Sequence, residues 1–387
     1  MPRPFSLDAL RRWPDVDARE LRASDAADRL LLDESSEARR AAPAGTVVVI
    51  GDGYGALTLG AADDGATGIR VHQDPLSGER ALAANASQFG VENVFRSLPL
   101  GPELVAGARV VLLRLPRALD ALDDVSALVA AHADRDVIVY AGGMLKHMST
   151  AMNEVLLRSF ARLDVSHARQ KARVLTAREP LDGREPGARE PAPALRPRVL
   201  PHAVPGLDDE LVVCAFGGAF AGAGVDIGTR FLLEQLLDAA PPPSGDIIDF
   251  ACGTGVIATW LALRHPERRI VASDQSASAV ASAEATAKAN GVGDRVHVVR
   301  DLGLEARPDA TASFVALNPP FHAGAAVPGG VAEPLFAEAG RVLAPGGQLW
   351  AVWNSPQRYR PALERLVGPT RQVARNAKFT VTVSTRP

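Results

Sequence analysis

The four residues Asn-Pro-Pro-Phe at positions 318 to 321 follow a short apolar run, 312–317, which is typical of a buried strand. Two successive prolines end such a strand, because each lacks an N–H donor and has a fixed φ angle. The side-chain oxygen of Asn318 and the carbonyl of Pro319 are then two fixed hydrogen-bond acceptors, and Phe321 adds an aromatic face. Two acceptors fit the two hydrogens of one planar amine, so the motif predicts chemistry on an exocyclic amine or amide nitrogen.

A second motif, D249-F-A-C-G-T-G255, ends one strand and opens a helix, and its glycines let a ligand approach the backbone. Asp274 ends the next strand, about 20 residues later, where an acid can accept hydrogen bonds from ribose hydroxyls. Asp301 ends a third strand, where we expect an adenine to lie. The sequence has neither the pyrophosphate-binding nor the P-loop glycine pattern. These residues therefore predict a nucleoside without phosphates, and S-adenosylmethionine is such a cofactor.

Together the two motifs indicate transfer of a methyl group from that cofactor to a nitrogen. An exocyclic nitrogen is a poor nucleophile, because its lone pair is delocalised into the ring. Acceptors on both of its hydrogens favour pyramidalisation and stabilise the positive charge that develops on attack. Alignment of nitrogen, methyl and sulfur contributes several kcal/mol more, about 7–11 at most. We expect Asn318, Pro319 and Phe321 to be catalytic. His322 can hydrogen-bond the base or a phosphate, and a capping or packing role fits it equally well.

The elements that must position these residues alternate along the chain. After residue 206, helical patterns (from 256, over 276–290 and over 331–343) separate apolar runs typical of strands, which cover 247–250, 270–273, 296–300, 312–317, 348–353 and 379–383. This alternation predicts a mainly parallel sheet covered on both faces, with ligands beyond the carboxyl ends of its strands. Before these elements we expect Thr229 to cap a helix over 230–238, although Asp226 and Thr229 can also reach the site.

The two halves of the chain repeat each other. V47-V-V-I-G-D-G-Y-G55 matches residues 247–255 at an offset of 200, and V71-H-Q-D74 matches residues 271–274 at the same offset. Two later strand patterns recur in the same order. The common order and nearly constant offset indicate a duplication.

The two copies differ in their polar residues. Val49 and Leu115 stand in the first copy where the second has Asp249 and Asn318, so the first copy keeps the fold pattern and loses the polar groups. We therefore expect the second copy to be catalytic and the first to be a scaffold or a grip on the substrate. The predicted domains are a degenerate methyltransferase-like domain over residues 1–175, a Pro/Arg-rich linker over 176–205 and a catalytic domain over 206–387.

The composition indicates a cytoplasmic protein without a membrane span. The chain has 387 residues, 47% of them hydrophobic and 22% charged, which suits two globular domains. Its two cysteines have no metal-ligand spacing and fit a reducing compartment. The N-terminus carries charges where a signal peptide has an apolar run, and the longest mostly apolar stretch, 211–225, is too short to cross a bilayer.

The charge is unevenly distributed. The net charge is −3, but residues 341–387 carry eight Lys or Arg side chains against one acid, Glu364. A basic segment on an acidic body can direct a nucleic acid to one face, although solvated surface charge explains it equally well. Lys378 and Arg375 are the side chains that we expect to bind phosphates.

Five segments of the second half carry a resemblance to a known family: G217-G-A-F-A-G-A-G-V-D-I-G-T-R230, D249-F-A-C-G-T-G255, S273-D-Q-S276, N318-P-P-F-H-A-G324 and K378-F379. They resemble class I S-adenosylmethionine-dependent methyltransferases. More narrowly, they resemble the ribosomal RNA guanine-N2 methyltransferases, both the C type, which modifies the small ribosomal RNA, and the G type, which modifies the large one. The duplicated layout is also that of this family. In the first half, L115-P-R-A-L119, K146-H-M148 and Q170-K-A-R-V-L175 lean towards the G type.

The resemblance implies an α/β protein with two tandem Rossmann-like class I methyltransferase folds, the N-terminal copy degenerate. It implies methyl transfer from S-adenosylmethionine to guanine N2 in ribosomal RNA, with the large subunit slightly favoured. The guanine would be held by Asn318, Pro319 and Phe321. The cofactor would be held by Asp249, Ala251, Gly253, Gly255, Asp274, Gln275, Asp301 and Asn318. Phe250-Ala251 departs from the small glycine-containing pair that is usual in relatives.

Two other functions also fit the residues. One is methyl transfer to another planar nitrogen, adenine N6 or a protein glutamine, and the other is a non-enzymatic RNA-binding or assembly factor. The sequence leaves open which nucleotide is modified and whether the substrate is naked RNA or an assembled particle. We expect ribosomal RNA or a ribosomal subunit as the partner and, because two tandem domains can substitute for a dimer, a monomer.

Overall fold

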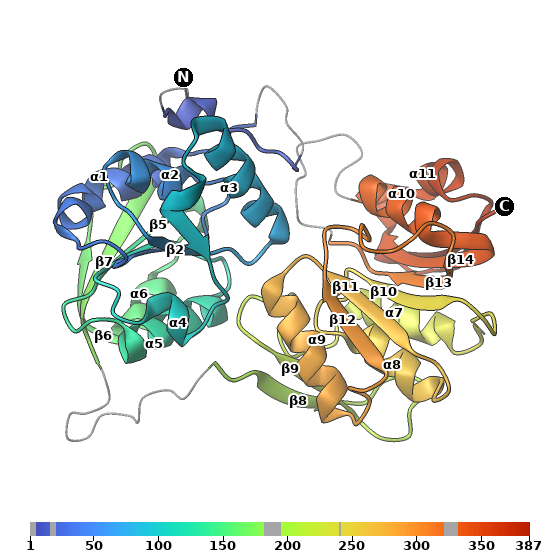
Figure 1. Cartoon of the computed structure of the whole chain (residues 1–387). Coiled ribbons are helices and arrows are strands. Elements are labelled where there is room, and N and C mark those ends of the chain that lie inside the picture. The colour runs from blue at the N-terminus through green and yellow to red at the C-terminus, as the bar shows by residue number, and fades with distance from the viewer. Residues whose placement is uncertain (1–4, 16–20, 182–194, 240, 321–331) are drawn as a thin grey trace. The chain divides into compact units, whose positions relative to one another are not determined.

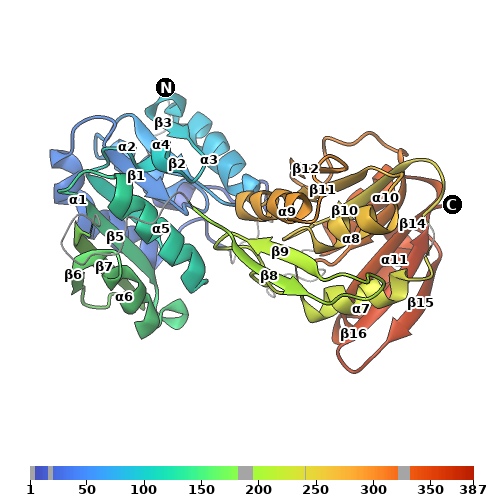
Figure 2. The ribbon, with the colours of Figure 1, turned by 90° about the horizontal axis from the view of Figure 1, so that it is seen from below.

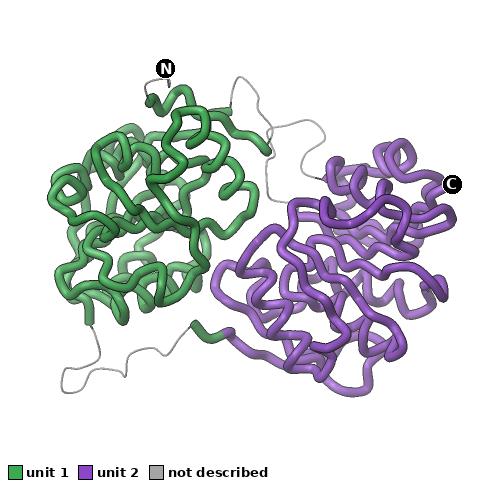
Figure 3. Tube along the Cα trace, in the orientation of Figure 1, with its two compact units in different colours: residues 1–196 green, residues 197–387 purple. Residues whose placement is uncertain are grey.

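The computed structural model describes residues 5–15, 21–181, 195–239, 241–320 and 332–387. The chain divides into two compact units, unit 1 (Met1–Arg196) and unit 2 (Pro197–Pro387), which Figure 3 shows in green and purple. Each unit contains its own seven-stranded sheet and its own buried core, so each has the anatomy of a domain.

The sheet of unit 1 has the strand order β3-β2-β1-β4-β5-β7-β6, and Figure 1 labels β2, β5, β6 and β7 of this sheet. Its strands are β1 (Val47–Ile50), β2 (Ile69–His72), β3 (Phe95–Ser97), β4 (Val110–Arg114), β5 (Ile138–Met144), β6 (Phe160–Val165) and β7 (Ala172–Pro180). Its helices are α1 (Ala26–Ala41), α2 (Ala56–Asp63), α3 (Leu76–Phe89), α4 (Pro102–Val105), α5 (Leu119–His132) and α6 (Thr150–Leu157), with 3-10 turns at Leu7–Ala9, Glu92–Val94 and Leu145–His147. The first five strands are parallel, whereas β7 is antiparallel to β5 and β6.

Helices cover both faces of this sheet, and β1 shows why. Its four residues are all apolar and buried. Because side chains alternate along a strand, Val47 and Val49 enter the core formed with α1, α2 and α3. Val48 and Ile50 enter the core formed with α4, α5 and α6. A continuous apolar run is what a central parallel strand needs when both of its faces are buried.

The sheet of unit 2 has the strand order β12-β11-β10-β13-β14-β16-β15. Its strands are β10 (Asp246–Phe250), β11 (Ile270–Asp274), β12 (Val296–Arg300), β13 (Ala312–Leu317), β14 (Leu343–Asn354), β15 (Thr370–Arg375) and β16 (Phe379–Thr385). Its helices are α7 (Ile227–Leu236), α8 (Val256–Arg264), α9 (Ala277–Ala289), α10 (Ala332–Val342) and α11 (Arg360–Leu366), with a 3-10 turn at Ser355–Gln357. A separate hairpin, β8 (Arg198–His202) and β9 (Leu211–Ala215), precedes them.

The two sheets have the same topology, strand for strand. The first, second and fourth strands of each unit occupy the same places, and the antiparallel last pair recurs in both. The segments that match in the sequence fall on equivalent strands, β1 with β10 and β2 with β11. These observations confirm the predicted α/β class with two tandem Rossmann-like folds.

The connection between the units is shorter than the predicted linker 176–205. Strand β7 continues to Pro180, because beyond Ala177 it still pairs with β6, where Phe160 is the partner of Pro180. Strand β8 already begins at Arg198. The prediction missed both strand segments, because β7 ends in Arg178-Glu179-Pro180 without an apolar residue and Pro201 interrupts the short run of β8.

The backbone edge of β9 is completed by side chains of α9 instead of a further strand. Backbone amides of β9 and of the residue after it donate to these side chains at 2.9–3.0 Å. The acceptors are Ser282 and Thr286 of α9 and Asn290 at its C-cap, which are four residues apart and so lie along one face of the helix. Figure 2 shows the hairpin alongside α9. The contact fixes the start of the segment 216–226 that leads into α7.

Within the described residues, none of the helices combines the length and apolar character needed to cross a membrane. The same residues contain no group of three or more His, Cys, Asp or Glu side chains placed to hold a metal ion. Cys214 and Cys252 are buried and unbridged.

Candidate active site

The turn between β10 and α8 is built around the side chain of Asp249. Asp249 is fully buried, and its Oδ2 atom accepts the amide of Ala258, the third residue of α8, at 2.8 Å. Its Oδ1 atom is also buried and has no hydrogen-bond partner among the described residues. Burial raises the pKa of Asp249 to about 8, although the hydrogen bond from Ala258 acts in the opposite direction. One oxygen therefore positions the helix, and the other can receive a donor or a cation.

Two glycines of this turn have left-handed φ angles for different reasons, 53° at Gly253 and 73° at Gly255. A Cβ at Gly255 would lie 2.8 Å from Ala283, so close packing against α9 excludes a side chain. A Cβ at Gly253 would meet nothing within 4 Å, so this backbone faces open space. Ala251 has a φ of 55°, a conformation that costs a non-glycine residue about 1–2 kcal/mol, which explains why a glycine suits this position better.

The end of β11 contributes Asp274 and Gln275. The Oδ2 atom of Asp274 accepts the amide of Gly253 at 3.0 Å, and its Oδ1 atom accepts the amide of Ser276 at 2.9 Å. This carboxylate therefore joins the glycine turn to β11. The side-chain oxygen of Gln275 is buried and has no partner within the described part of the chain. It is a second acceptor beside the turn.

Asp301 follows β12 and lies beside Asp274. Its amide donates to the carbonyl of Asp274 at 3.0 Å, and its Oδ2 atom accepts the amide of Ala306 at 2.9 Å. Asp301 is therefore at the predicted place but also closes a local turn. The structure brings the acids predicted from the sequence together at the carboxyl ends of β10, β11 and β12.

Asn318 follows β13 and is held by the first turn of α7. Its Nδ2 atom lies 3.1 Å from Asp226 Oδ2 and 2.9 Å from Thr229 Oγ1. Asp226 is the N-cap of α7, since its Oδ2 atom also accepts the amides of Gly228 and Thr229, at 2.9 and 3.2 Å. The predicted cap, Thr229, is wrong, because this residue lies inside the helix and its hydroxyl contacts Asn318 instead.

The remaining residues of the Asn-Pro-Pro-Phe motif are only partly described. The Oδ1 atom of Asn318 is buried and has no partner among the residues that the structure describes. Pro319 is buried and Pro320 is exposed. Phe321 and His322 lie outside the described residues, so their roles remain predictions.

Two basic residues, Lys378 and Arg375, lie at the same edge of the sheet as Asn318. Phe379 begins β16, and a Cβ at Gly228 of α7 would lie 3.2 Å from its ring. Lys378 therefore stands next to the helix turn that holds Asn318. Arg375 is the last residue of β15. Because β15 is antiparallel to β16, it ends at the edge where β16 begins. Both cations are exposed.

Unit 1 has the same arrangement with different side chains. The strand registers make Arg114, not Leu115, the counterpart of Asn318, because each directly follows the residue paired with the end of β1 or β10. Arg114 donates to both carboxylate oxygens of Asp25, at 2.8 and 3.0 Å, and lies 3.1 Å from Asp28. The predicted loss of polar groups is therefore wrong at this position, which an ion-pair cluster fills.

At the position equivalent to Asp249, unit 1 also differs from the prediction. Val49 stands there, but Asp52, three residues later, accepts the amides of Gly55 and Thr58 at 3.1 and 2.8 Å. Sequence comparison missed this carboxylate, because it reaches the helix from the turn instead of the strand.

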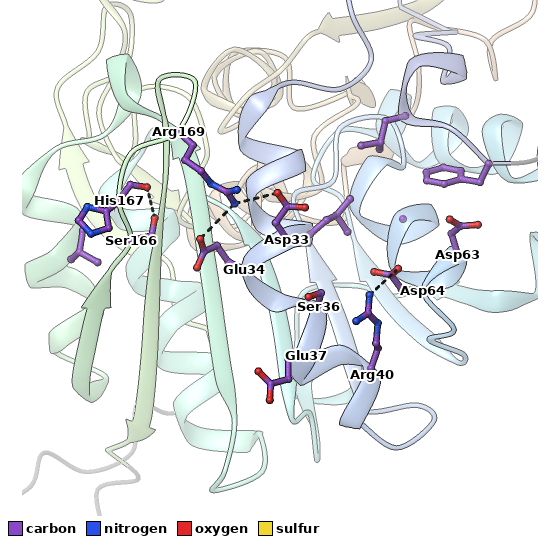
Figure 4. Close-up of a pocket in the computed structure, with 15 residues that line it drawn as sticks. Asp33, Glu34, Ser36, Glu37, Arg40, Asp63, Asp64, Ser166, His167 and Arg169 are labelled. Atoms are coloured by element: carbon purple, nitrogen blue, oxygen red, sulfur yellow. Dashed lines mark hydrogen bonds and ion pairs between the residues drawn. The ribbon is translucent and has the colours of Figure 1, made fainter.

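A hollow of about 1020 Å³ lies in unit 1 among α1, α2 and the connection from β6 to β7 (Figure 4). Five carboxylates line it, against two arginines, Arg40 and Arg169. Arg169 lies 3.1 Å from Asp33, and Arg40 lies 3.9 Å from Asp64. The excess of negative charge repels phosphate, so this hollow is unsuited to a nucleic acid.

Comparison with known proteins matches both halves of the chain. The family model described as RLMG N-terminal domain matches residues 4–180, and the one described as Methyltransferase small domain matches residues 210–383. A ribosomal RNA large subunit methyltransferase G from Streptomyces coelicolor is 35% identical, over 98% of this chain and 98% of its own. The protein of that name from Pseudomonas paraeruginosa is 31% identical, over 98% and 97%.

Among solved structures, the T. thermophilus 16S rRNA N2 G1207 methyltransferase (RsmC), in complex with AdoMet and guanosine, aligns with a TM-score of 0.72. The alignment covers 92% of each chain at 21% identity. This likeness supports the fold with its two sheets.

Proposed function

The chain belongs to the ribosomal RNA large subunit methyltransferase G family, and we propose that it methylates N2 of a guanine in large-subunit ribosomal RNA with S-adenosylmethionine. The observation that carries this chemistry is the environment of Asn318. Asp226 and Thr229 hold its amide nitrogen, so its unpaired oxygen can accept a hydrogen bond from an amine. The proposal also agrees with the basic edge of the same sheet.

The residues at the ends of β10, β11 and β12 fit S-adenosylmethionine. Three acids, Asp249, Asp274 and Asp301, suit a ligand with positive charge, and Asp249 Oδ1 is free to face it. Backbone amides hold the Asp274 carboxylate, which we assign to the ribose hydroxyls, and a Cβ at Gly253 would meet nothing within 4 Å. When bound, the cofactor supplies an electrophilic methyl group on a positively charged sulfur.

The supporting roles are divided among the other predicted cofactor residues. Gln275 offers a buried acceptor next to Asp274. Gly255 acts by letting α8 and α9 pack closely. Ala251 shapes the turn through its left-handed backbone. We assign Asn318 to both the cofactor and the guanine.

At the acceptor nitrogen, the protein acts through hydrogen bonds and alignment. Asn318 Oδ1 and the carbonyl of Pro319 accept the two N–H groups of the guanine amine. They would therefore stabilise the positive charge that develops on this nitrogen as it gains the methyl group, while the bond from that group to the cofactor's sulfur would break and leave a neutral thioether. The surplus proton leaves to solvent, so no strong base is needed. Phe321 is assigned to stacking on the base. The guanine must be unpaired or flipped out, because pairing hides N2 in the groove.

The rest of the molecule has a binding role in this proposal. Lys378 and Arg375 bind phosphates of the RNA strand along the edge of the sheet. Unit 1 is a degenerate copy that acts as a scaffold or an RNA grip. The two tandem domains of one chain can substitute for the two protomers of a dimer, so we propose that the active form is a monomer.

Replacing Asn318 with alanine tests the site. Asn318→Ala should abolish methyl transfer to ribosomal RNA while the dissociation constant for S-adenosylmethionine changes little. Asn153→Ala, on α6 of unit 1, is the matched control and should retain full activity. Full activity in Asn318→Ala would exclude the proposed role of the motif.

A further inference from the structure

We propose that Asp226 and Thr229 are positioning residues that fix the orientation of the Asn318 side-chain amide, so that its oxygen faces the guanine amine. The inference rests on the proposed function, since it concerns the same site. The residues come from elements far apart in the sequence: Asn318 follows β13, whereas Asp226 and Thr229 open α7.

An asparagine amide fits almost equally well in two orientations, related by a half turn about its last bond. In one, the oxygen faces the guanine amine and accepts its hydrogen. In the other, an NH₂ group faces an NH₂ group, and two donors meet without an acceptor. The surroundings must select the productive orientation, because the shape of the amide does not.

The surroundings of Asn318 make this selection chemically. Asp226 Oδ2, 3.1 Å from the amide nitrogen, belongs to a carboxylate that also accepts the amides of Gly228 and Thr229. An ionised carboxylate only accepts hydrogen bonds, so the group that faces it must be the NH₂. An oxygen in that place would be repelled.

Thr229 provides the second acceptor. Its Oγ1 atom lies 2.9 Å from the same nitrogen, and only 8% of the residue is exposed. The NH₂ group has two hydrogens, and Asp226 and Thr229 together take both. The other end of the amide, Oδ1, is buried and unpaired within the described residues. Both hydrogens of the amide nitrogen are therefore paired, whereas the amide oxygen keeps an unused acceptor.

The first turn of α7 is itself held in place. A Cβ at Gly228 would lie 3.0 Å from Asp226 Oδ2 and 3.2 Å from the ring of Phe379. The turn is therefore packed closely against β16, and this packing holds the backbone that carries the two acceptors.

Unit 1 shows which part of the arrangement is general. Asp25, the N-cap of α1, accepts the amides of Ala27 and Asp28 at 2.8 and 3.2 Å, as Asp226 does in α7. Asp25 and Asp28 hold Arg114, the counterpart of Asn318. The contact between strand end and helix cap thus belongs to the fold. An arginine has no acceptor atom, so only unit 2 presents an oxygen beyond this contact.

Two substitutions separate orientation from folding. Thr229→Val keeps the shape of the side chain and removes the hydroxyl. Asp226→Ser keeps an oxygen that can cap the helix, but the serine side chain is too short to reach Asn318. We expect each substitution to lower kcat about 10- to 100-fold, because this is the effect of losing one hydrogen bond of a charged or buried group. The affinity for S-adenosylmethionine should not change. Thr229→Ser keeps the hydroxyl and should therefore retain the activity that Thr229→Val loses. Thr259→Val in α8 removes a buried hydroxyl that has no hydrogen-bond partner among the described residues, and it should have no effect.

The decisive measurement compares RNA that carries guanosine or inosine at the methylated position. Inosine lacks the N2 amine, so wild-type protein should bind the guanosine RNA more tightly. In the Asp226→Ser/Thr229→Val protein this ratio should fall to about one, with an unchanged melting temperature. If the two residues had a purely structural role, the variant would bind both RNAs more weakly by the same factor, and the ratio of affinities would be preserved. That result would overturn the inference. A wild-type kcat in the double variant would also overturn it.

Two further outcomes remain distinguishable. If Asp226→Ser unfolds, Thr229→Val and its rescue by Thr229→Ser give the same ratio test, and an unchanged ratio in Thr229→Val overturns the inference. If the wild-type protein transfers no methyl group to guanine N2, the proposed function fails, and the inference fails with it.

Discussion

Asp52 and Asp249 each accept the amide of the third residue of the following helix, Thr58 in α2 and Ala258 in α8, both at 2.8 Å. Asp52 also accepts the amide of Gly55 at 3.1 Å, whereas Asp249 leaves its Oδ1 atom unpaired within the described residues. Both copies thus use a buried carboxylate to position a helix. The unpaired oxygen of Asp249 is what distinguishes the proposed cofactor site from its degenerate counterpart.

Neutralising the two carboxylates should therefore have different effects. Asp249→Asn keeps the size of the side chain but removes its charge, so the dissociation constant for S-adenosylmethionine should rise about tenfold or more. Asp52→Asn should leave it unchanged, because the proposed cofactor site lies in unit 2. Isothermal titration calorimetry measures both constants. Equal effects of the two substitutions would contradict the assignment.

Cofactor binding should depend on pH through Asp249. Its pKa in the folded protein, about 8, lies above the ordinary 3.8, so the carboxyl group is mostly protonated at neutral pH. A cationic ligand favours the carboxylate, hence binding releases this proton. Affinity should increase by up to about tenfold per pH unit between about pH 6 and 7.5. The same shift lowers the stability of the cofactor-free protein as the pH rises from near 4 towards 8.

Calorimetry in buffers of different ionisation enthalpy counts the released proton. Asp249→Asn should abolish both the proton release and the pH dependence. A wild-type affinity that is constant across the neutral range would show that Asp249 does not face the cofactor.

The two left-handed glycines should respond differently to a methyl group. Gly253→Ala introduces a Cβ into open space, so it should cost about 1–2 kcal/mol of stability and also weaken cofactor binding. Gly255→Ala adds a clash with Ala283, worth about 1–3 kcal/mol, to the same backbone strain. Urea unfolding with and without S-adenosylmethionine separates the two effects. Equal losses of stability would argue against the close packing at Gly255.

The basic edge predicts the salt dependence of RNA binding. Lys378→Ala and Arg375→Ala should each reduce the slope of log K against log salt by about 0.7–0.9, the value for one phosphate contact. Arg269→Ala is the control, because this exposed arginine precedes β11 at the opposite edge of the sheet. Binding assays from about 50 to 300 mM salt, which spans the physiological range, measure the slopes. A larger effect of Arg269→Ala would place the RNA elsewhere.

Much of the fold follows from local pattern. Strand β1 is a continuous apolar run, β13 is apolar except for Ser313, and the glycine turns mark the helix starts. These features identified the sheet, the duplication and the acids Asp249 and Asp274. Strand β15 was not predicted, since its sequence Thr370–Arg375 is mostly polar and exposed, as suits a strand at the edge of a sheet.

The relations that sequence could not provide depend on register and on contacts between distant segments. Arg114 is the counterpart of Asn318 only when the strands are paired, because the connections before β4 and β13 differ in length. Thr229 and Asp226 are both good caps, and only the contact with Asn318 separates their roles.

The most direct test of the central claim is a methyl-transfer assay with labelled S-adenosylmethionine and ribosomal RNA or ribosomal particles from cells that lack this protein. Nucleoside analysis then identifies the labelled base. The account predicts label in N2-methylguanosine from the large-subunit RNA with the wild-type protein and none with Asn318→Ala. Label in another nucleoside or in protein, or no label despite cofactor binding, would contradict it.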